Sequence, residues 1–305
     1  MKIMDFPALL QEGRMGQKDL TGKNFILYPD VYADTLNALA YAGRKVVHAE
    51  DLLPAPTESF YHVDQGKLTD QFNDVAMNEM RNGMVHVLYI VENEVQAKPK
   101  TILRKAGYEG ALYRRQYDGS PAYPIVSLIL YWGAASWNQP VSIKELFQET
   151  DLDKGTWKYI TNAKLCVYEM AHLSKQVRNR FKSDMRIVVD YLAERHAYKP
   201  SAQKIVHPEA LLLMLKALTG DKRYLEILIA LTEEEKKGEV SMCELLDKYE
   251  NRGIEKGRRQ GIQQGESRFA LLSEKLLNLD RIDDLRKAVA SKRYRNQLYK
   301  EFGMV

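Results

Sequence analysis

The order of apolar and polar residues predicts several strands in the first half of the chain. Five runs are rich in branched and aromatic residues, a composition typical of strands. The expected strands cover residues 60–63, 72–80, 84–91, 123–132 and 164–168. Arg81-Asn82-Gly83 separates two of them and predicts a hairpin, because Asn-Gly favours a tight connection.

Two helices are expected among these strands. Apolar residues at helical spacing predict one helix over 32–42, and Gly43 follows where a helix stop belongs. The second helix is expected over 99–116, with a face of small residues that could pack closely against the sheet. That face holds Ala106, Gly107, Gly110 and Ala111. Helices mixed with strands predict an α/β fold, in which helices cover a sheet.

After about residue 170 the apolar spacing becomes helical. Helices are expected over 173–194, 208–218, 224–231 and 240–249, with a helical hairpin at the C-terminal end. The expected domains are a core over 1–170, a helical extension over 171–250 and a helical tail over 251–305.

The tail carries glycine at every fourth position, at Gly253, Gly257, Gly261 and Gly265. Each glycine costs a helix about 1 kcal/mol relative to alanine. The repeat therefore indicates either a flexible hinge or a helix that contacts a partner closely. The second reading would allow a homo-oligomer that forms through the C-terminal helices.

Composition narrows the class of protein. A hydrophobic content of 45% with 28% charged residues is typical of a soluble globular chain and excludes a disordered one. The two cysteines are too few for a disulfide framework or a structural zinc site. The N-terminus lacks the apolar core of a signal peptide, and no apolar stretch is long enough for a membrane span. We therefore expect a cytoplasmic protein with no membrane contact.

Positive charge is concentrated in two places. From Arg252 to the end, thirteen Lys and Arg face seven Asp and Glu, a net charge of +6, although the whole chain carries only +4. The second cluster lies between residues 97 and 116 and consists of Lys98, Lys100, Arg104, Lys105, Arg114 and Arg115. Such clusters could contact DNA, because lysine and arginine neutralise phosphates. A solvated helix face explains each cluster equally well.

Three acids are candidates for a metal site. Glu92 and Glu94 are two residues apart, so on a strand they point to the same face. A hairpin centred near Asn82-Gly83 would bring Asp74 opposite Val91 or Glu92. Neighbouring carboxylates raise one another's pKa unless a cation joins them, and Mg²⁺ prefers such oxygen ligands. Ordinary surface acids remain the alternative.

Several segments together resemble the recombination-promoting nuclease family, also called YhgA-like or putative transposase proteins, within the PD-(D/E)XK nuclease superfamily. The similarity follows the family's order through most of the chain. It rests on Tyr32-Ala33-Asp34 with Asn37, Tyr41 and Gly43; Asn73-Asp74-Val75; Glu92-Asn93-Glu94 with Tyr108, Tyr113 and Gln116; Leu130-Tyr131-Trp132-Gly133 with Trp137 and Pro140; Met242-Cys243-Glu244-Leu245-Leu246; and the glycine repeat.

The resemblance implies a fold and a site. The fold is a restriction-endonuclease-like core, a mixed sheet flanked by helices, followed by a helical C-terminal region. Asp74, Glu92 and the backbone carbonyl of Asn93 would bind Mg²⁺ or Mn²⁺, which lowers the pKa of a bound water. Asp34 would be an outer-shell or orienting group, with an acid stabilised by the helix dipole as the alternative. Gln116 would contact the substrate.

Glu94 departs from the pattern of the superfamily, which places lysine, or in many relatives glutamine, at this position. Glu94 could be a third metal ligand or a general base, or it could mark a degenerate site. The resemblance thus implies a metal-dependent DNA endonuclease linked to recombination or transposition. The alternatives are a nuclease-fold protein that binds DNA or a protein without cutting, and a helical interaction module.

Overall fold

The computed structural model describes residues 24–56, 58–62, 68–72, 75–117, 121–147 and 152–304, with side chains except at 58–62, 68–72 and 196. The chain divides into two compact units, Met1–Cys243 and Glu244–Val305. In the described part of the chain, no helix is both long and apolar enough to cross a membrane.

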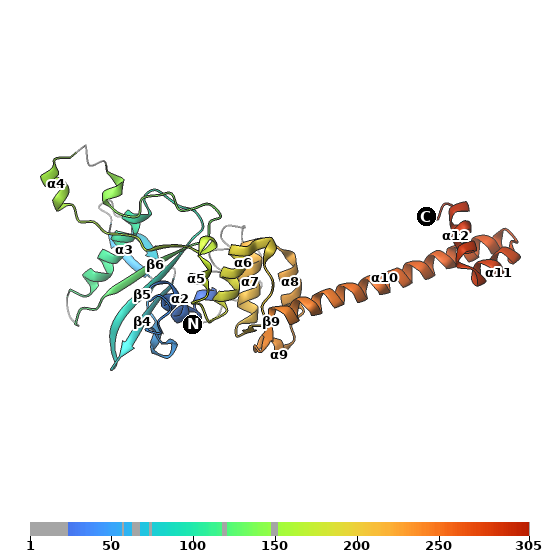
Figure 1. The fold of residues 1–305 in the computed structure, drawn as a ribbon, viewed down its shortest axis with the longest axis horizontal. Helices are drawn as coiled ribbons and strands as arrows, with labels where there is room; N and C mark the ends of the chain where they lie inside the picture. The colour runs from blue at the N-terminus through green and yellow to red at the C-terminus, as the bar shows by residue number, and fades with distance from the viewer. Residues whose placement is uncertain are drawn as a thin grey trace. The chain divides into compact units, whose positions relative to one another are not determined.

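A mixed five-stranded sheet forms the centre of the first unit (Figure 1). Its order is β1-β4-β5-β6-β7, with β5 in the middle. The strands are β1 (Leu52–Pro54), β4 (Val75–Arg81), β5 (Met84–Glu94), β6 (Ile125–Tyr131) and β7 (Val167–Glu169). Pairing is antiparallel between β1 and β4 and between β4 and β5, and parallel from β5 through β6 to β7. The predicted mixed sheet is therefore confirmed.

The β4–β5 hairpin turns where the sequence predicts. Asn82 and Gly83 both have positive φ, +51° and +76°, as a tight two-residue hairpin turn requires. The resulting register pairs Val75 with Val91. Asp74 itself lies outside the described residues.

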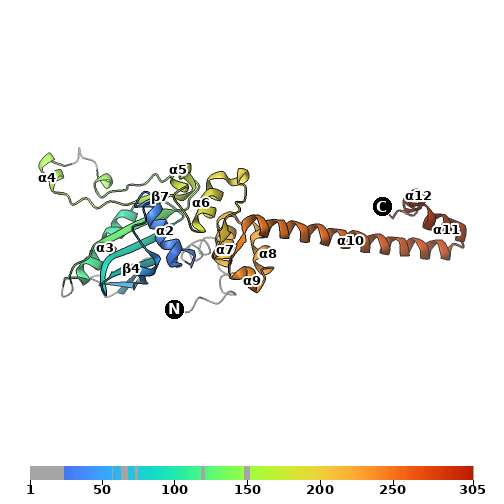
Figure 2. The same cartoon turned by 60° about the horizontal axis from the view of Figure 1, so that its bottom comes forward.

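Helices cover both faces of the sheet. On one face, Leu112 of α3 (Thr101–Arg115) packs with Leu88 and Ile90 of β5. On the other face lies α2 (Pro29–Leu39). Tyr41 follows this helix, and its hydroxyl lies 2.8 Å from the Tyr89 hydroxyl of β5. Figure 2 shows α3, β4 and α2 from a second direction.

The small residues of α3 do not pack against the sheet, so that prediction is wrong. Gly107 and Gly110 are exposed, and a Cβ at either position would meet nothing within 4 Å. The buried face instead has helical spacing and consists of Thr101, Ile102, Lys105, Tyr108 and Leu112. Larger side chains occupy this face because they remove more surface from water.

Short elements and helices complete the first unit. They are η2 (Ala49–Asp51), β2 (Glu58–His62), β3 (Leu68–Phe72), η3 (Lys144–Leu146), α4 (Lys154–Tyr159), η5 (Met170–His172), α5 (Lys175–Arg178), α6 (Met185–Glu194), η6 (Arg195–Ala197), β8 (Lys204–Ile205), α7 (Pro208–Thr219), α8 (Lys222–Ile229), α9 (Glu233–Lys236) and β9 (Val240–Ser241).

The continuous helix predicted over 173–194 is wrong, because the chain breaks between α5 and α6. The Asp34 carboxylate of α2 accepts hydrogen bonds of 2.8 Å from the backbone N–H groups of both Lys182 and Ser183. This long-range contact satisfies backbone donors that a continuous helix would have paired internally.

The second unit is helical. It contains α10 (Met242–Asn278) except for its first two residues, together with α11 (Ile282–Ala290) and α12 (Lys292–Glu301). Leu272, Leu276, Ala288 and Leu298 form its buried cluster. The four repeated glycines lie inside α10, and a Cβ at any of them would meet nothing within 4 Å. Within this unit the glycine repeat therefore lies in regular helix.

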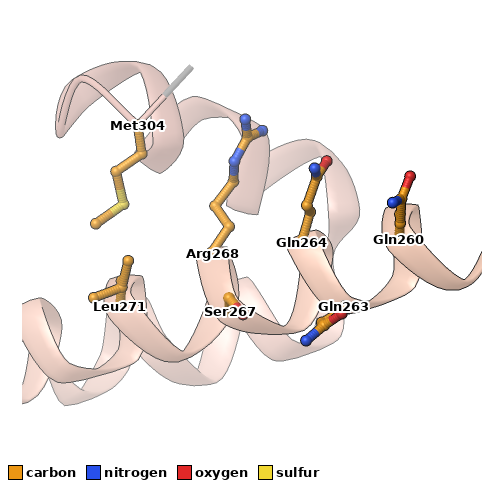
Figure 3. Close-up of a pocket in the computed structure, with 7 residues that line it drawn as sticks. All are labelled: Gln260, Gln263, Gln264, Ser267, Arg268, Leu271 and Met304. Atoms are coloured by element: carbon orange, nitrogen blue, oxygen red, sulfur yellow. The ribbon is translucent and has the colours of Figure 1, made fainter. Parts of the chain in front are cut away.

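An open groove of about 740 Å³ lies between the second half of α10 and Met304 near the end of the chain (Figure 3). Figure 3 shows Met304 beside Leu271, whereas Gln260, Gln264 and Arg268 follow one another along α10. The residues that line this groove are mainly polar and include no acid. The groove is therefore not the metal site predicted from the carboxylates of Asp74, Glu92 and Glu94.

Candidate functional site

Two buried acids lie at the carboxyl end of the central strand. Glu92 and Glu94 of β5 point to the face that α3 covers, since Leu88 and Ile90 of the same parity pack against that helix. The two acids are only 3% and 8% exposed. Burying two carboxylates so close together is costly unless neighbouring groups neutralise them.

Two bases from α3 provide this neutralisation. Lys105 Nζ lies 2.8 Å from Glu92 Oε1, and the side chains of this pair are 3% and 4% exposed. Arg104 Nη2 lies 3.4 Å from Glu92 Oε2 and forms a closer ion pair with Glu94. Burial lowers the pKa of Arg104, but the Glu94 carboxylate outweighs burial and leaves that pKa raised. The four side chains therefore form a cluster of two acids and two bases, which we call the Glu–Lys–Arg cluster, and a further acid, Glu109, lies 3.9 Å from Lys105.

Lys105 lies beside the two acids and not in an exposed basic cluster. The expected role is a DNA contact within a basic cluster, whereas the structure places its ammonium group in a buried ion pair with Glu92. The available signal was its position: Lys105 falls on the buried face of α3 with Ile102 and Tyr108. A lysine on the apolar face of the helix that follows an acid-bearing strand indicates a buried ion pair.

The other predicted DNA contacts do not form one surface with Lys105. Lys98 and Lys100 are exposed in the connection between β5 and α3, close in sequence to the acids. Arg114 and Arg115 are exposed at the far end of α3. Because a helix rises 1.5 Å per residue, Arg114 lies roughly 15 Å along the axis from Arg104. Exposed positive charge near the acids therefore comes from Lys98 and Lys100.

Asn93 lies between the two acids and points to the other face of the sheet. Its Oδ1 accepts a hydrogen bond of 2.9 Å from the indole N–H of Trp132. The Asn93 side chain is therefore directed away from Glu92 and Glu94, and the prediction that its backbone carbonyl binds a metal stays a prediction.

Two supporting residues have structural contacts instead of contacts at the acids. The hydrogen bonds described for Asp34 go to Lys182 and Ser183. Since α2 begins at Pro29, Asp34 lies beyond the first turn, and the helix-dipole explanation is wrong as well. Gln116 Oε1 accepts a hydrogen bond of 2.9 Å from the Tyr123 backbone, which fixes the approach to β6.

The donor chemistry of the Glu–Lys–Arg cluster fits a hard divalent ion. Mg²⁺ is often held by one or two carboxylates plus waters and a substrate phosphate, and Glu92 and Glu94 offer two carboxylates on one face. Within the described ranges, no three Asp, Glu, His or Cys side chains group as a metal site. A third protein carboxylate would have to come from a residue outside those ranges, such as Asp74.

Comparison with known proteins gives one match. A family model described as "Putative transposase, YhgA-like" matches residues 23–223. This range contains the whole sheet and all four members of the Glu–Lys–Arg cluster. No curated protein and no solved structure matches the chain.

Proposed function

The chain belongs to the family of YhgA-like putative transposases, and from this premise we propose that it is a Mg²⁺- or Mn²⁺-dependent endonuclease that hydrolyses phosphodiester bonds in DNA. The observation that supports this proposal best is the buried Glu92–Glu94 pair at the carboxyl end of β5, with Lys105 and Arg104 beside it. Glu92 and a lysine ammonium lie together at this strand end, and with Asp74 as the first acid they would make up the residue set of the superfamily pattern.

In this proposal Lys105 takes the place of the lysine that the superfamily pattern has at position 94. The superfamily pattern places lysine two residues after the second acid, where this chain has Glu94. Here an ammonium group reaches Glu92 from α3 instead, at 2.8 Å. We propose that Lys105 provides the positive charge near the attacking water and the scissile phosphate. It also fixes the orientation of the Glu92 carboxylate.

Glu94 can then serve as the proton acceptor. Its carboxylate lies on the same face of β5 as Glu92 and carries the acceptor oxygens that a general base needs. Asp74, Glu92 and the Asn93 carbonyl would hold the metal. When bound, the ion would neutralise charge on the phosphate and lower the pKa of a water.

One observation favours a second function, namely binding without cutting. Each described acid of the Glu–Lys–Arg cluster is already paired with a base of the same chain. A metal ion would have to share these carboxylates with Arg104 and Lys105. If it cannot, the fold would still offer Lys98 and Lys100 to a DNA backbone.

Nicking of a supercoiled plasmid with Mg²⁺, with Mn²⁺ and with EDTA distinguishes the two functions. Glu92→Gln should lower the metal-dependent rate by more than about 100-fold, because even outer-shell residues of metal sites contribute about 10- to 100-fold. Asp74→Asn should do the same. Metal-independent DNA binding with no nicking by the parent would favour the second function.

Glu79→Gln is the matched control for Glu92→Gln. Glu79 is also a buried strand carboxylate, 1% exposed and paired with Arg81 at 2.7 Å. It lies on the opposite face of the sheet, where its carboxylate accepts a hydrogen bond from Tyr89. Glu79→Gln should therefore keep the nicking rate of the parent. Equal rates for the parent and Glu92→Gln would refute the proposed site.

A further inference from the structure

A second group of polar side chains lies at the same end of the sheet as the acids. The last residues of the three parallel strands share one register, because Glu94 pairs with Tyr131 and Tyr131 with Glu169. Paired residues in a sheet point to the same face, and neighbouring strands lie about 4.8 Å apart. The backbones of Glu94 and Glu169 are therefore roughly 10 Å apart.

Glu169 holds a histidine at this edge. His172 Nδ1 lies 2.9 Å from Glu169 Oε2 and 3.5 Å from the Ser136 hydroxyl in the loop after β6. The hydrogen bond with His172 is the main cause that lowers the pKa of Glu169, so the acid is ionised at neutral pH. The ionised carboxylate at Nδ1 fixes the orientation of the imidazole ring.

Only one of the two ring nitrogens of His172 takes part in the described hydrogen bonds. Both described hydrogen bonds use Nδ1, so the arrangement is not a serine–histidine–acid relay, which needs both nitrogens. Among the described residues, no hydrogen bond reaches Nε2. The His172 side chain is 38% exposed, so Nε2 can reach a ligand from solvent.

The acids on the helix packed against the His172 segment have basic partners of their own. The segment η5, which ends at His172, contacts α6 and β6. On α6, Asp190 pairs with Arg178 and Arg186, and Glu194 pairs with Arg178. Glu169 is thus the acid that faces the imidazole directly.

We propose that His172, held by Glu169, is a DNA-binding residue that contacts a backbone phosphate next to the one cut at Glu92 and Glu94. The proposal rests on the proposed function for its substrate. A protonated imidazole donates a charge-assisted hydrogen bond to a phosphate oxygen. Lys98 and Lys100 lie in the connection after β5, and His172 follows β7, so both groups lie at the same end of the parallel strands as the Glu–Lys–Arg cluster.

The test measures affinity for a fluorescent DNA duplex by anisotropy, over a range of salt, in EDTA. Each phosphate contact contributes about 0.9 to the slope of log affinity against log salt. At pH 5.5, His172→Gln should lower this slope by up to about 0.9. At pH 8.5 the parent and the variant should have the same slope, because an ordinary histidine is then neutral.

His48→Gln is the matched control. His48 also pairs with a glutamate, Glu50, at 3.7 Å, and its side chain is 40% exposed. It lies just before β1, whose first residue, Leu52, pairs with Glu79, while Glu79 pairs with Val87. His48 is thus near the opposite end of the sheet from Glu94. Its substitution should leave the slope of the parent unchanged at both pH values.

The outcomes separate this inference from the proposed function. If His172→Gln keeps the slope of the parent at pH 5.5, or if His48→Gln lowers the slope equally, the role of His172 is wrong even when the plasmid is nicked. If the slope falls as expected but nothing is nicked, the phosphate contact stands and cleavage is wrong. If the parent binds no duplex at either pH, both are wrong.

Discussion

Replacing Lys105 tests the Glu–Lys–Arg cluster through stability. At 2.8 Å and an effective dielectric constant of 20, the attraction between Lys105 and Glu92 is about 6 kcal/mol before desolvation is subtracted. Both side chains are almost fully buried, so Lys105→Met leaves the Glu92 charge without its main partner. Such a loss costs about 3–5 kcal/mol. Arg104, 3.4 Å away, remains as a weaker partner, so we expect a value near the lower limit.

Urea unfolding followed by tryptophan fluorescence measures this loss. The three tryptophans of the chain, Trp132, Trp137 and Trp157, all lie in the first unit, so their signal reports on the unit that contains the cluster. Lys98→Met is the matched control, because Lys98 is exposed and its substitution should change stability by less than about 0.5 kcal/mol.

A double-mutant cycle with Glu92→Gln separates the ion pair from packing. Glu92→Gln removes the charge that Lys105→Met leaves unpaired, so the double variant should be more stable than the sum of the single effects predicts, with a coupling of about 2–3 kcal/mol. A cost below about 1 kcal/mol for Lys105→Met, or additive effects in the cycle, would refute the buried pair.

Three further predictions concern backbone and surface features of the chain. Gly83→Ala should lower the unfolding free energy by about 1 kcal/mol from its φ of +76° alone. Gly43→Ala should lower it by more, because the added Cβ would also meet the Arg180 side chain at 3.1 Å. Equal losses of unfolding free energy in urea would contradict this. Burial raises the pKa of Asp30, but the hydrogen bond and charge of His207 outweigh burial and leave that pKa below its usual value. The stabilisation that the Asp30–His207 pair gives the fold is therefore lost as pH falls below about 4. Asp30→Asn should therefore lower the unfolding free energy by less than about 1 kcal/mol at pH 5, and a gap that does not shrink as the pH is lowered below 4 would refute the pairing. Alanine at all four repeated glycines of α10 should raise helicity and melting temperature in circular dichroism, by about 0.5–1 kcal/mol per site, and a loss would show that the glycines serve a partner surface.

Local chemistry explains which features could be predicted from the sequence. The Asn82-Gly83 turn depends on two adjacent residues with positive φ, and the common face of Glu92 and Glu94 depends only on the period of a strand. These predictions needed no knowledge of distant contacts. The YhgA-like resemblance added the mixed sheet with helices on both faces, which the structure confirms.

The wrong predictions all depended on long-range contacts. Lys105 was misassigned because the small residues of α3 were expected to face the sheet, whereas Lys105 lies on the face that does. The break near Ser183 depends on Asp34, 149 residues earlier in the chain. Glu94 and Glu169 lie at the same end of the sheet because three strands pair in parallel, and no short sequence motif encodes that pairing. The contacts of these residues therefore depend on tertiary packing, which the spacing of residues in the sequence does not show.

The initial rate of Mg²⁺-dependent plasmid nicking by the parent, Glu92→Gln and Glu79→Gln tests the central claim most directly. We predict that the parent and Glu79→Gln cut at similar rates and that Glu92→Gln is slower by more than about 100-fold. No Mg²⁺-dependent nicking by the parent, or equal loss in both variants, would contradict the account.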